Sequence, residues 1–478
     1  MEQIFHFYQY TIFFYSAVIT FGYVSLAILG YFNINNKKSI YTEIEDNLLN
    51  SFPEEAPGIS VVTPAYNEDL IIIDSAHSLL NLNYPNFEVI IVNDGSTDDT
   101  LETLIKEFEL ETIPYPYIEK IRSQPVRHIF KSTNPRYSNL TIVDKENGGT
   151  KADAMNAGVN IAKFDYFINT DIDGLLDPNT LAKMIVPVLD SETHVIAVGA
   201  TLRMVNACEV DKGSITRVRP PNHMIPIFQE TEYLRSYLIG KMGWSTLNMI
   251  PNVSGGFGLF DKNVVIGAGG FDPLSHAEDM DMTLRMIAYM HHSKKKYLIR
   301  QIPDTCCWTE GPSNLRLLYR QRTRWGRGLL QIFFVHRRYL FNPKYGRMGI
   351  ILLPYSLLFD LLAPILTVTG LFMLIYLLLN NQVNFETFWL LLFFVYMIGV
   401  SMSLVAITSD LANKKLYKNY SEYGKLILYS LFEVIAYQPF NTIFYVIGYG
   451  QFLSNREFKW TSMTRQGYTR NIEEESSN

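Results

Sequence analysis

The sequence contains little cysteine and no excess of basic residues. Its three cysteines, of which Cys306 and Cys307 are adjacent, are too few for a disulfide framework and fit reduced thiols in a cytosol-facing domain. The formal net charge is −6 and there is no basic stripe of the kind that phosphate backbones require, so the composition predicts no nucleic-acid partner. No Cys or His pair has zinc-ligand spacing, and we expect His291 and His292 in a solvated basic loop beside Lys294–Lys296.

Two well-defined phosphate-binding signatures are also missing. Neither G-x-x-x-x-G-K-[ST] nor a strand-linked G-x-G-x-x-G occurs, so neither a P-loop NTPase nor a dinucleotide-binding protein is supported. What is present is a chain of 478 residues, with room for two or three domains and a large core. Residues 58–320 have the strand, helix and charge patterning of a soluble domain, whereas both ends of the chain are apolar.

The apolar ends predict an integral membrane protein. Tyr10–Phe32 has no charged residue and is long enough to cross a hydrocarbon core of about 30 Å. Because a basic start and a small-residue cleavage site are missing, we expect a retained anchor rather than a signal peptide. Asp360 and Glu433 are the only acids in three further apolar stretches, Ile350–Leu379, Phe388–Ile407 and Leu426–Gly448.

Lysine and arginine predict the orientation of these spans. A cytoplasmic central domain is indicated by Lys37 and Lys38 and by the basic residues before the second span, which are Arg322, Arg324, Arg327, Arg337, Arg338, Lys344 and Arg347. Asn380–Glu386 has no basic residue and is expected outside, and the chain returns to the cytoplasm at Lys414, Lys415, Lys418 and Lys425.

The tail conflicts with this count. Three C-terminal spans would leave it outside, yet it carries Arg456, Lys459, Arg465 and Arg470. One alternative is that a stretch is interfacial or re-entrant, at Pro354, Pro364 or Pro439. The other is that the tail departs from the rule, and the sequence leaves both open.

The soluble segment begins with alternating strands and helices. Ile59–Thr63 is a β-branched strand that Pro64 should end, and a periodic helix then runs to about Leu80. Phe87–Asn93 is the next strand, followed by a helix from about Asp98–Thr100. This alternation predicts βαβ crossovers and a parallel sheet, with ligands at the carboxyl ends of the strands. Asp94 stands at such an end.

A second strand, Asp165–Thr170, ends in two carboxylates. Asp171 and Asp173 lie one residue apart and repel each other unless a cation or a proton is shared between them. Oxygen ligation of Mg²⁺, which keeps part of its shell for phosphates, would relieve that repulsion. The alternative is a solvated turn, since Gly174, Asp177 and Pro178 follow.

Asn147–Gly158 has the features of an anion site. Two glycines allow a tight bend, and a helix from about Lys151 would place free N–H groups beside a cation. The alternative is a plain glycine turn before a helix.

Two later stretches complete the set of motifs. The glycine-rich Asn252–Phe271 could let a flat ligand approach the backbone, or could mark β-bulges. In Ser275–Arg285, helix capping is a good explanation for Asp281, whereas Asp279 is better explained as a general base. Finally, Gln321–Trp325 (QRTRW) lies on a basic helix before the membrane, and a positive-inside anchor would explain its arginines but not the pentad.

Together these motifs resemble the processive family 2 glycosyltransferases, which include the hyaluronan, chitin, cellulose and poly-N-acetylglucosamine synthases. The resemblance rests on Asp94 in VNDGS, Asp171 and Asp173 in TDID, Asp279 in AED, and QRTRW ahead of membrane helices. It covers residues 58–338. Ala277 departs from the usual threonine, and the glycine-rich residues 255–258 do not match the cellulose-synthase version closely, which leaves the donor sugar open.

The resemblance implies an α/β GT-A fold, a UDP-sugar donor, Mg²⁺ or Mn²⁺, and inversion at the anomeric carbon. Asp94 and Lys151 would bind the donor with Asp171 and Arg324, and Asp171 and Asp173 would hold the metal, with Asp173 the more direct ligand. Asp279 would be the catalytic base. Gln321 and Trp325 would bind the acceptor, with Trp325 stacked on its sugar ring.

We therefore expect a transmembrane anchor in residues 1–40, a cytosolic GT-A domain with the QRTRW helix in 58–340, transmembrane helices in 341–455 and a polar tail in 456–478. The expected function is polymerisation of UDP-GlcNAc or UDP-glucose into a β-linked polysaccharide and its export across the plasma (inner) membrane. The alternatives are transfer of one sugar to a membrane lipid, or a transporter or scaffold that only binds a nucleotide sugar. Membrane lipids are expected partners, and an export or accessory subunit is left open.

Overall fold

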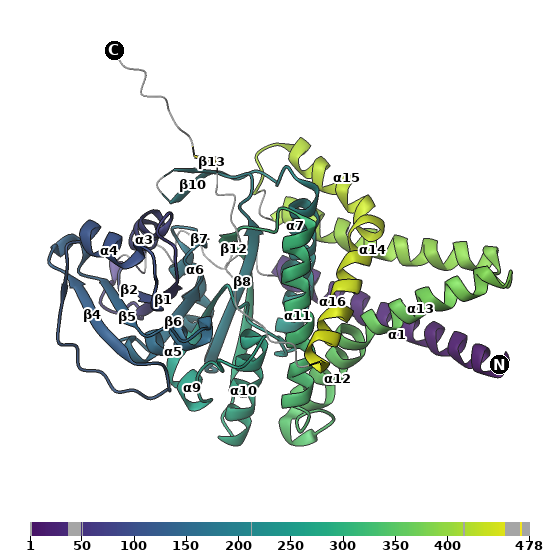
Figure 1. Cartoon of the computed structure of the whole chain (residues 1–478), viewed down its shortest axis with the longest axis horizontal. Helices are drawn as coiled ribbons and strands as arrows, with labels where there is room; N and C mark the ends of the chain where they lie inside the picture. The colour runs from purple at the N-terminus through teal and green to yellow at the C-terminus, as the bar shows by residue number, and fades with distance from the viewer. Residues whose placement is uncertain are drawn as a thin grey trace, which may run out of the picture. The chain divides into compact units, whose positions relative to one another are not determined.

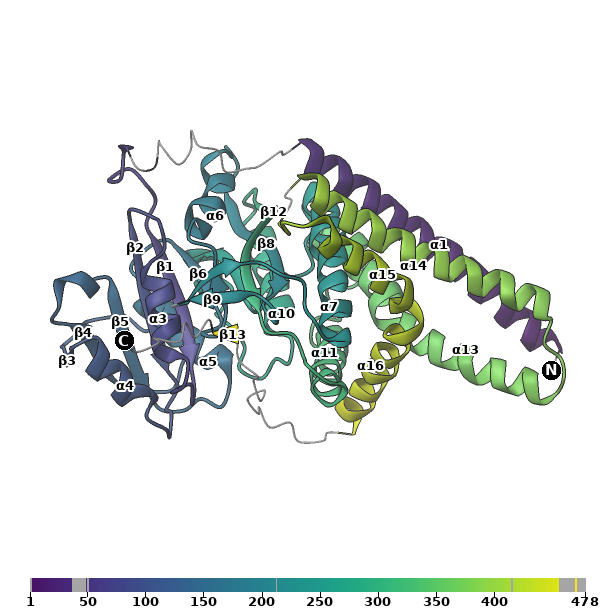
Figure 2. The same cartoon turned by 90° about the horizontal axis from the view of Figure 1, so that it is seen from above.

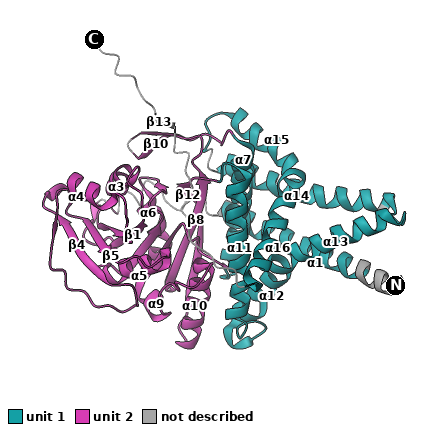
Figure 3. Ribbon diagram, in the orientation of Figure 1, with its two compact units in different colours: residues 1–37, 223–249, 312–457 teal, residues 38–222, 250–311, 458–478 magenta. Residues whose placement is uncertain are grey.

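The computed structural model describes residues 2–36, 49, 51–211, 213–413, 416–454 and 469–470 (Figure 1). It divides into two compact units, each described here by itself (Figure 3). Unit 1 contains residues 1–37, 223–249 and 312–457, and unit 2 contains residues 38–222, 250–311 and 458–478.

Unit 2 is built on one large mixed sheet. Within the described residues the sheet has ten strands in the order β3-β4-β5-β2-β1-β6-β11-β8-β12-β7. Their bounds are β1 Ile59–Ala65, β2 Phe87–Asn93, β3 Leu110–Thr112, β4 Val126–Ser132, β5 Leu140–Lys145, β6 Tyr166–Thr170, β7 Leu175–Leu176, β8 Val195–Met204, β11 Phe257–Asp261 and β12 Leu298–Thr309. A small second sheet joins β9 Glu209–Asp211, β10 Ser214–Arg217 and β13 Thr469–Arg470.

The centre of the large sheet is parallel, as the sequence predicts. β5, β2, β1 and β6 pair in parallel, whereas β11 runs antiparallel to both β6 and β8. Apolar β-branched side chains fill β1 and β2, and both strands are buried, which is the environment of a parallel sheet covered on both faces. β1 does not end at Pro64, because Pro64 still pairs with Val92 and the strand continues to Ala65.

Helices alternate with the strands along the chain of unit 2. They are α3 Ile72–Leu80, α4 Thr100–Glu107, α5 Lys151–Ile161, α6 Thr180–Leu189, α9 Lys262–Gly267 and α10 Glu278–His292, with a 3₁₀ turn at Pro135–Tyr137. The prediction of a basic loop at His291 and His292 is wrong, because these residues form the last turn of α10. Met280, Leu284 and Ile287 form a continuous buried face on α10. The packing of this face stabilises the helix as far as His292.

Unit 1 is helical. Its described elements are α1 Glu2–Asn36, α7 Met224–Leu234, the π-helical η2 Arg235–Lys241, α8 Met242–Thr246, α11 Leu315–Val335, α13 Leu362–Leu379, α14 Phe385–Asn413, α15 Tyr420–Ala436 and α16 Gln438–Leu453. Short turns at η3 Pro343–Tyr345, η4 Met348–Leu352, α12 Leu353–Ser356 and η5 Leu357–Leu361 lead into α13. Figure 2 shows α1 and α14 side by side.

Among the described residues, three helices are long and apolar enough to cross a membrane. They are Tyr10–Ile34, Met348–Leu379 and Phe388–Asn413. These match the first three predicted spans. The basic residues Lys37, Lys38, Lys414, Lys415, Arg456, Lys459 and Arg465, on which the predicted orientation depends, lie outside the described residues.

The fourth apolar stretch, Leu426–Gly448, is not a single helix. α15 ends at Ala436 and α16 starts at Gln438, with a non-helical φ of −121° at Tyr437. Pro439 stands in the first turn of α16, where the missing N–H of proline is tolerated and a continuing helix is not favoured. The break in this stretch therefore lies at Tyr437, two residues before Pro439.

A buried ion pair fixes α15 within unit 1. The Arg235 guanidinium donates to both oxygens of Glu433, at 2.7 and 3.0 Å, and to the Ser403 hydroxyl at 2.6 Å. Gln438 Nε2 donates to the same carboxylate at 2.9 Å. Glu433 is fully buried, so these donors replace the water that its charge would otherwise require.

Replacing Glu433 with Ala should destabilise unit 1, because Arg235 would lose its buried counter-charge. Removing one partner of a buried pair costs about 3 kcal/mol or more. We expect a lower thermal unfolding midpoint for the detergent-purified protein. Glu386→Ala, at an exposed position in the first turn of α14, is the matched control and should change little. An unchanged midpoint for Glu433→Ala would contradict the structural role of the pair.

Candidate active site

The charged residues singled out in unit 2 lie at element ends. Asp94 directly follows β2, Asp171 directly follows β6, and Lys151 and Asp279 stand in the first turns of α5 and α10. β2 and β6 flank β1 and are both parallel to it, so their carboxyl ends lie at the same edge of the sheet. This topology brings Asp94 and Asp171 to one side of unit 2.

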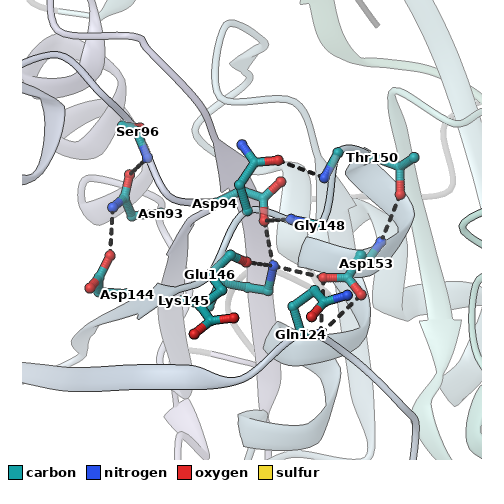
Figure 4. Close-up of polar contacts among 12 residues, drawn as sticks. Asn93, Asp94, Ser96, Gln124, Asp144, Lys145, Glu146, Gly148, Thr150 and Asp153 are labelled. Carbon is teal, nitrogen blue, oxygen red and sulfur yellow. Dashed lines mark hydrogen bonds and ion pairs between the residues drawn. The ribbon is translucent and has the colours of Figure 1, made fainter. Parts of the chain in front are cut away.

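Asp94 belongs to a buried charge network (Figure 4). Its Oδ1 accepts from Lys145 Nζ and, at 3.0 Å, from the N–H of Gly148. Lys145 Nζ also contacts Asp153 Oδ2 at 2.7 Å and the Glu146 carbonyl oxygen at 2.5 Å. Lys145 is fully buried at the end of β5, so Asp94 and Asp153 share one cation that the sequence reasoning did not single out.

Gly148 and Gly149, in the loop before α5, require glycine for different reasons. Gly149 has a φ of +72°, a left-handed conformation that favours glycine. A side chain at Gly148 would place its Cβ 2.2 Å from Asp153 Oδ2, so glycine leaves room for the carboxylate that holds Lys145. The Asn147–Gly158 stretch is therefore more than a plain turn.

Lys151 connects this loop to Asp171. Its Nζ donates to Asp171 Oδ1 and, at 2.6 Å, to the carbonyl oxygen of Gly255. Burial lowers the pKa of Lys151, but the carboxylates of Asp171, Glu278 and Asp173 raise it by more, so the net pKa is raised. Lys151 is therefore held as a cation among carboxylates.

Gly255 links Lys151 to Asp279 through two backbone hydrogen bonds. Its carbonyl accepts from Lys151, and its N–H donates to Asp279 Oδ2 at 3.1 Å. Asn252 Nδ2 donates to the same oxygen at 2.7 Å, and the N–H of Met280 donates to Asp279 Oδ1 at 2.8 Å. These three donors fix the direction of the Asp279 carboxylate.

Asp281 does not cap α10, and that expectation is wrong. The N-cap residue is Ala277, which makes no side-chain capping hydrogen bond. Asp281 is buried and pairs with Arg285, at 2.8 Å to Nε and 2.5 Å to Nη2. Arg285 also donates to the carbonyl oxygens of Ala268 and Gly270, so this pair holds α10 to the segment that follows α9.

Asp173 follows Asp171 in a tight turn, in which the N–H of Gly174 donates to the Asp171 carbonyl at 2.9 Å. The described residues contain no group of three or more Asp, Glu, His or Cys side chains arranged to hold a metal ion. Asp171 and Asp173 nevertheless offer hard oxygen donors, and Asp171 already attracts the Lys151 ammonium. The pair fits a divalent ion that takes its other ligands from a phosphate.

The buried thiols lie beneath this turn. A Cβ on Gly174 would stand 3.3 Å from Cys307 Sγ. Burial raises the pKa values of the Cys306 and Cys307 thiols, and the nearby carboxylates add to the shift. Both therefore remain protonated, and neither has the properties of a nucleophile.

The QRTRW residues lie on α11 of unit 1. Gln321 Oε1 accepts from Gln229 at 3.4 Å, and Arg324 and Trp325 are half-buried. Arg322 is buried and donates to both oxygens of Glu232, at 2.8 and 2.6 Å. Its guanidinium carbon also lies 4.2 Å from the centre of the Trp325 ring. A positive-inside anchor therefore does not account for Arg322, which is a packing residue.

Sequence comparison matches this arrangement to a known family. The model for "Glycosyl transferase family 2" matches residues 60–233, and that for "Glycosyl transferase family group 2" matches residues 185–404. The first match contains Asp94, Lys151, Asp171 and Asp173. The chain carries glycosyl transferase family 2 domains over residues 60–404.

Curated relatives of this glycosyltransferase are bacterial polysaccharide synthases. It is 26% identical over 327 residues to the poly-beta-1,6-N-acetyl-D-glucosamine synthase of Staphylococcus aureus (strain COL), an alignment that covers 67% of this chain and 66% of the relative. It is 27% identical over 284 residues to the synthase of that name from Staphylococcus epidermidis, covering 59% of this chain and 57% of the relative. The alignments thus span less than two thirds of these relatives.

A solved structure supports the fold. The mannosyltransferase PcManGT from Pyrobaculum calidifontis, in complex with GDP-Man and Mn2+, superposes with a TM-score of 0.51 and 16% identity, covering 91% of this chain and 99% of that chain. At this identity the likeness concerns the fold. The predicted α/β GT-A fold with apolar helices at both ends is confirmed.

Replacing Gly148 with Ala should destabilise the glycosyltransferase, because the new methyl group would overlap Asp153 Oδ2. Overpacking of this kind costs about 1–3 kcal/mol. We expect a lower thermal unfolding midpoint. Gly424→Ala is the matched control, since it adds the same methyl group at an exposed helical position and no atom lies within 4 Å of the added Cβ. Equal midpoints for the two variants would contradict the tight contact.

Proposed function

We propose that the protein is a membrane-embedded, inverting glycosyltransferase that polymerises UDP-GlcNAc into a β-linked polysaccharide and exports it. The observation that carries the proposal is the contact made by Gly255, which joins the Lys151–Asp171 pair to Asp279. A site for a phosphorylated donor and a fixed carboxylate base are thereby linked through one residue.

The donor would lie along the edge of the sheet. Asp94 uses Oδ1 for Lys145 and Gly148, which leaves Oδ2 for an N–H of the nucleoside. Lys151 and the N-terminal turn of α5 would bind the diphosphate, since a helix N-terminus beside a cation attracts anions. Asp171 and Asp173 would hold Mg²⁺ or Mn²⁺, which neutralises charge on the diphosphate.

Asp279 is proposed as the base. Its carboxylate takes the proton of the acceptor hydroxyl while that oxygen bonds to the anomeric carbon and the bond to the diphosphate breaks. Attack opposite the leaving group inverts the configuration. Because the leaving diphosphate is stabilised by Lys151 and other cations, it needs no protonated carboxylic acid, and one base suffices.

The acceptor is proposed to bind at α11. Gln321 would hydrogen-bond the terminal sugar, Arg324 the diphosphate, and Trp325 would stack on the acceptor ring. The Arg322 guanidinium packs on the Trp325 indole and would hold that ring in place for stacking. The three membrane-capable helices of unit 1 support a synthase that takes its donor from the cytosol and passes the chain across the plasma membrane.

The curated relatives favour N-acetylglucosamine over glucose as the donated sugar, since both are named for a polymer of N-acetylglucosamine. The test uses the full-length protein in nanodiscs with Mg²⁺ or Mn²⁺ and either UDP-GlcNAc or UDP-glucose. UDP release and product size are measured together. We expect UDP release and a high-molecular-weight product with UDP-GlcNAc.

Two results would contradict the proposal in different ways. UDP release with only a lipid-linked or short product would indicate transfer of one sugar to a lipid. Polymer formation from UDP-glucose alone would retain the synthase and reject the proposed donor.

Asp279→Asn should abolish transfer and retain donor binding. The amide keeps an acceptor oxygen for Asn252 and Gly255 but cannot take a proton, so the transfer rate should fall about 100- to 10,000-fold. UDP affinity, measured by calorimetry, should stay close to that of the wild type. Asp165→Asn is the matched control, because Asp165 precedes β6 at the opposite edge of the sheet. Wild-type transfer by Asp279→Asn would reject the base assignment.

A further inference from the structure

Lys145 is a fully buried charged residue of unit 2 that the proposed mechanism does not use. We infer that Lys145 is a positioning residue for nucleotide recognition: it keeps Asp94 as a hydrogen-bond acceptor with one oxygen directed to the base, and thereby sets the preference for uracil. The inference rests on the proposed function, because it assumes that Asp94 meets the nucleoside.

The ammonium of Lys145 has no unused donor. It has three N–H groups and three acceptors, which are Asp94 Oδ1, Asp153 Oδ2 and the Glu146 carbonyl oxygen. Since the side chain is fully buried, water does not compete for these donors. The position of Nζ is therefore fixed from three sides, and the position of Asp94 Oδ1 is fixed with it.

The two carboxylates on Lys145 are themselves held. Asp94 Oδ1 also accepts from the N–H of Gly148 at 3.0 Å, and both contacts end on this single oxygen in Figure 4. Asp153 accepts from the N–H of Gln124, at 3.1 Å to Oδ1 and 3.2 Å to Oδ2. Neither carboxylate can rotate without breaking these hydrogen bonds, so Asp94 Oδ2 keeps one direction.

The network also couples the two ends of the donor site. Asp153 is in the first turn of α5, two residues after Lys151, and Lys151 contacts Asp171. A shift of Asp94 is therefore transmitted through Lys145 to the helix that is proposed to bind the diphosphate. The sequence separation of 51 residues between Asp94 and Lys145 shows that the fold, and not local sequence, creates this link.

Charge gives Lys145 a role beyond packing. With its cation, Asp94 is a pure acceptor and matches the N3–H donor of uracil. Without the cation, Asp94 and Asp153 repel each other in a buried space, so Asp94 Oδ2 loses its fixed direction. Cytosine has an acceptor at N3 and no N–H there to donate, so its binding depends less on that direction.

The test measures UDP and CDP affinity by calorimetry on the full-length wild type and Lys145→Met. We expect UDP affinity to fall about 10- to 100-fold in the variant, the range for loss of hydrogen bonds to a charged group. CDP affinity should fall less, so that the preference for UDP shrinks. Lys183→Met is the matched control, because Lys183 pairs with one carboxylate, Asp177, at 2.7 Å in the same unit. It should keep the wild-type preference.

A second variant covers the case in which Lys145→Met folds poorly. Lys145→Met combined with Asp153→Asn removes the repelling carboxylate, so its thermal stability should recover while UDP affinity stays low. An unchanged preference in either folded Lys145 variant, or an equal loss of both nucleotides, would overturn the inference. A wild type that binds UDP but transfers no sugar would reject the polymerase and leave the role of Lys145 to be judged from the binding data.

Discussion

Repulsion between carboxylates is the constraint on which the site of this glycosyltransferase depends. Asp94 and Asp153 are both buried against Lys145, and Asp171 is held by Lys151, which also feels Glu278 and Asp173. Two lysine cations therefore face five carboxylates, and negative charge is left in excess. This excess of negative charge is unfavourable for folding alone, and a bound divalent ion would offset it.

In unit 1, arginines neutralise the charges of two carboxylates. Arg322 binds Glu232 and packs on Trp325, and Arg235 binds Glu433, so each of these two acids has a bidentate arginine partner on another helix. These pairs connect α7 and η2 to α11 and α15. Within the QRTRW pentad, Arg322 therefore fixes the helix through its contacts with Glu232 and Trp325.

Much of the fold could be predicted because its determinants are local. The β-branched run of β2 marked its bounds, and the glycines before Lys151 located the start of α5. The cations could not be predicted in the same way. Lys145 is the last residue of a short strand and resembles a solvated residue, and only the pairing of β5 with β2 brings it close to Asp94. Lys151 and Gly255 are 104 residues apart in the sequence, so no local sequence pattern predicts their contact. The capping expectation for Asp281 failed for a different, local reason, since Arg285, four residues further along α10, binds its carboxylate.

The central claim is that Asp94, Lys151, Asp171 and Asp279 form one donor site with its base. It is tested most directly by an experimental structure of the Asp279→Asn protein with UDP-GlcNAc and Mn²⁺. The account predicts uracil at Asp94 Oδ2, the diphosphate and the ion between Lys151 and Asp171, and the anomeric carbon facing the substituted side chain at position 279. Nucleotide bound away from Asp94, or an anomeric carbon remote from position 279, would contradict it.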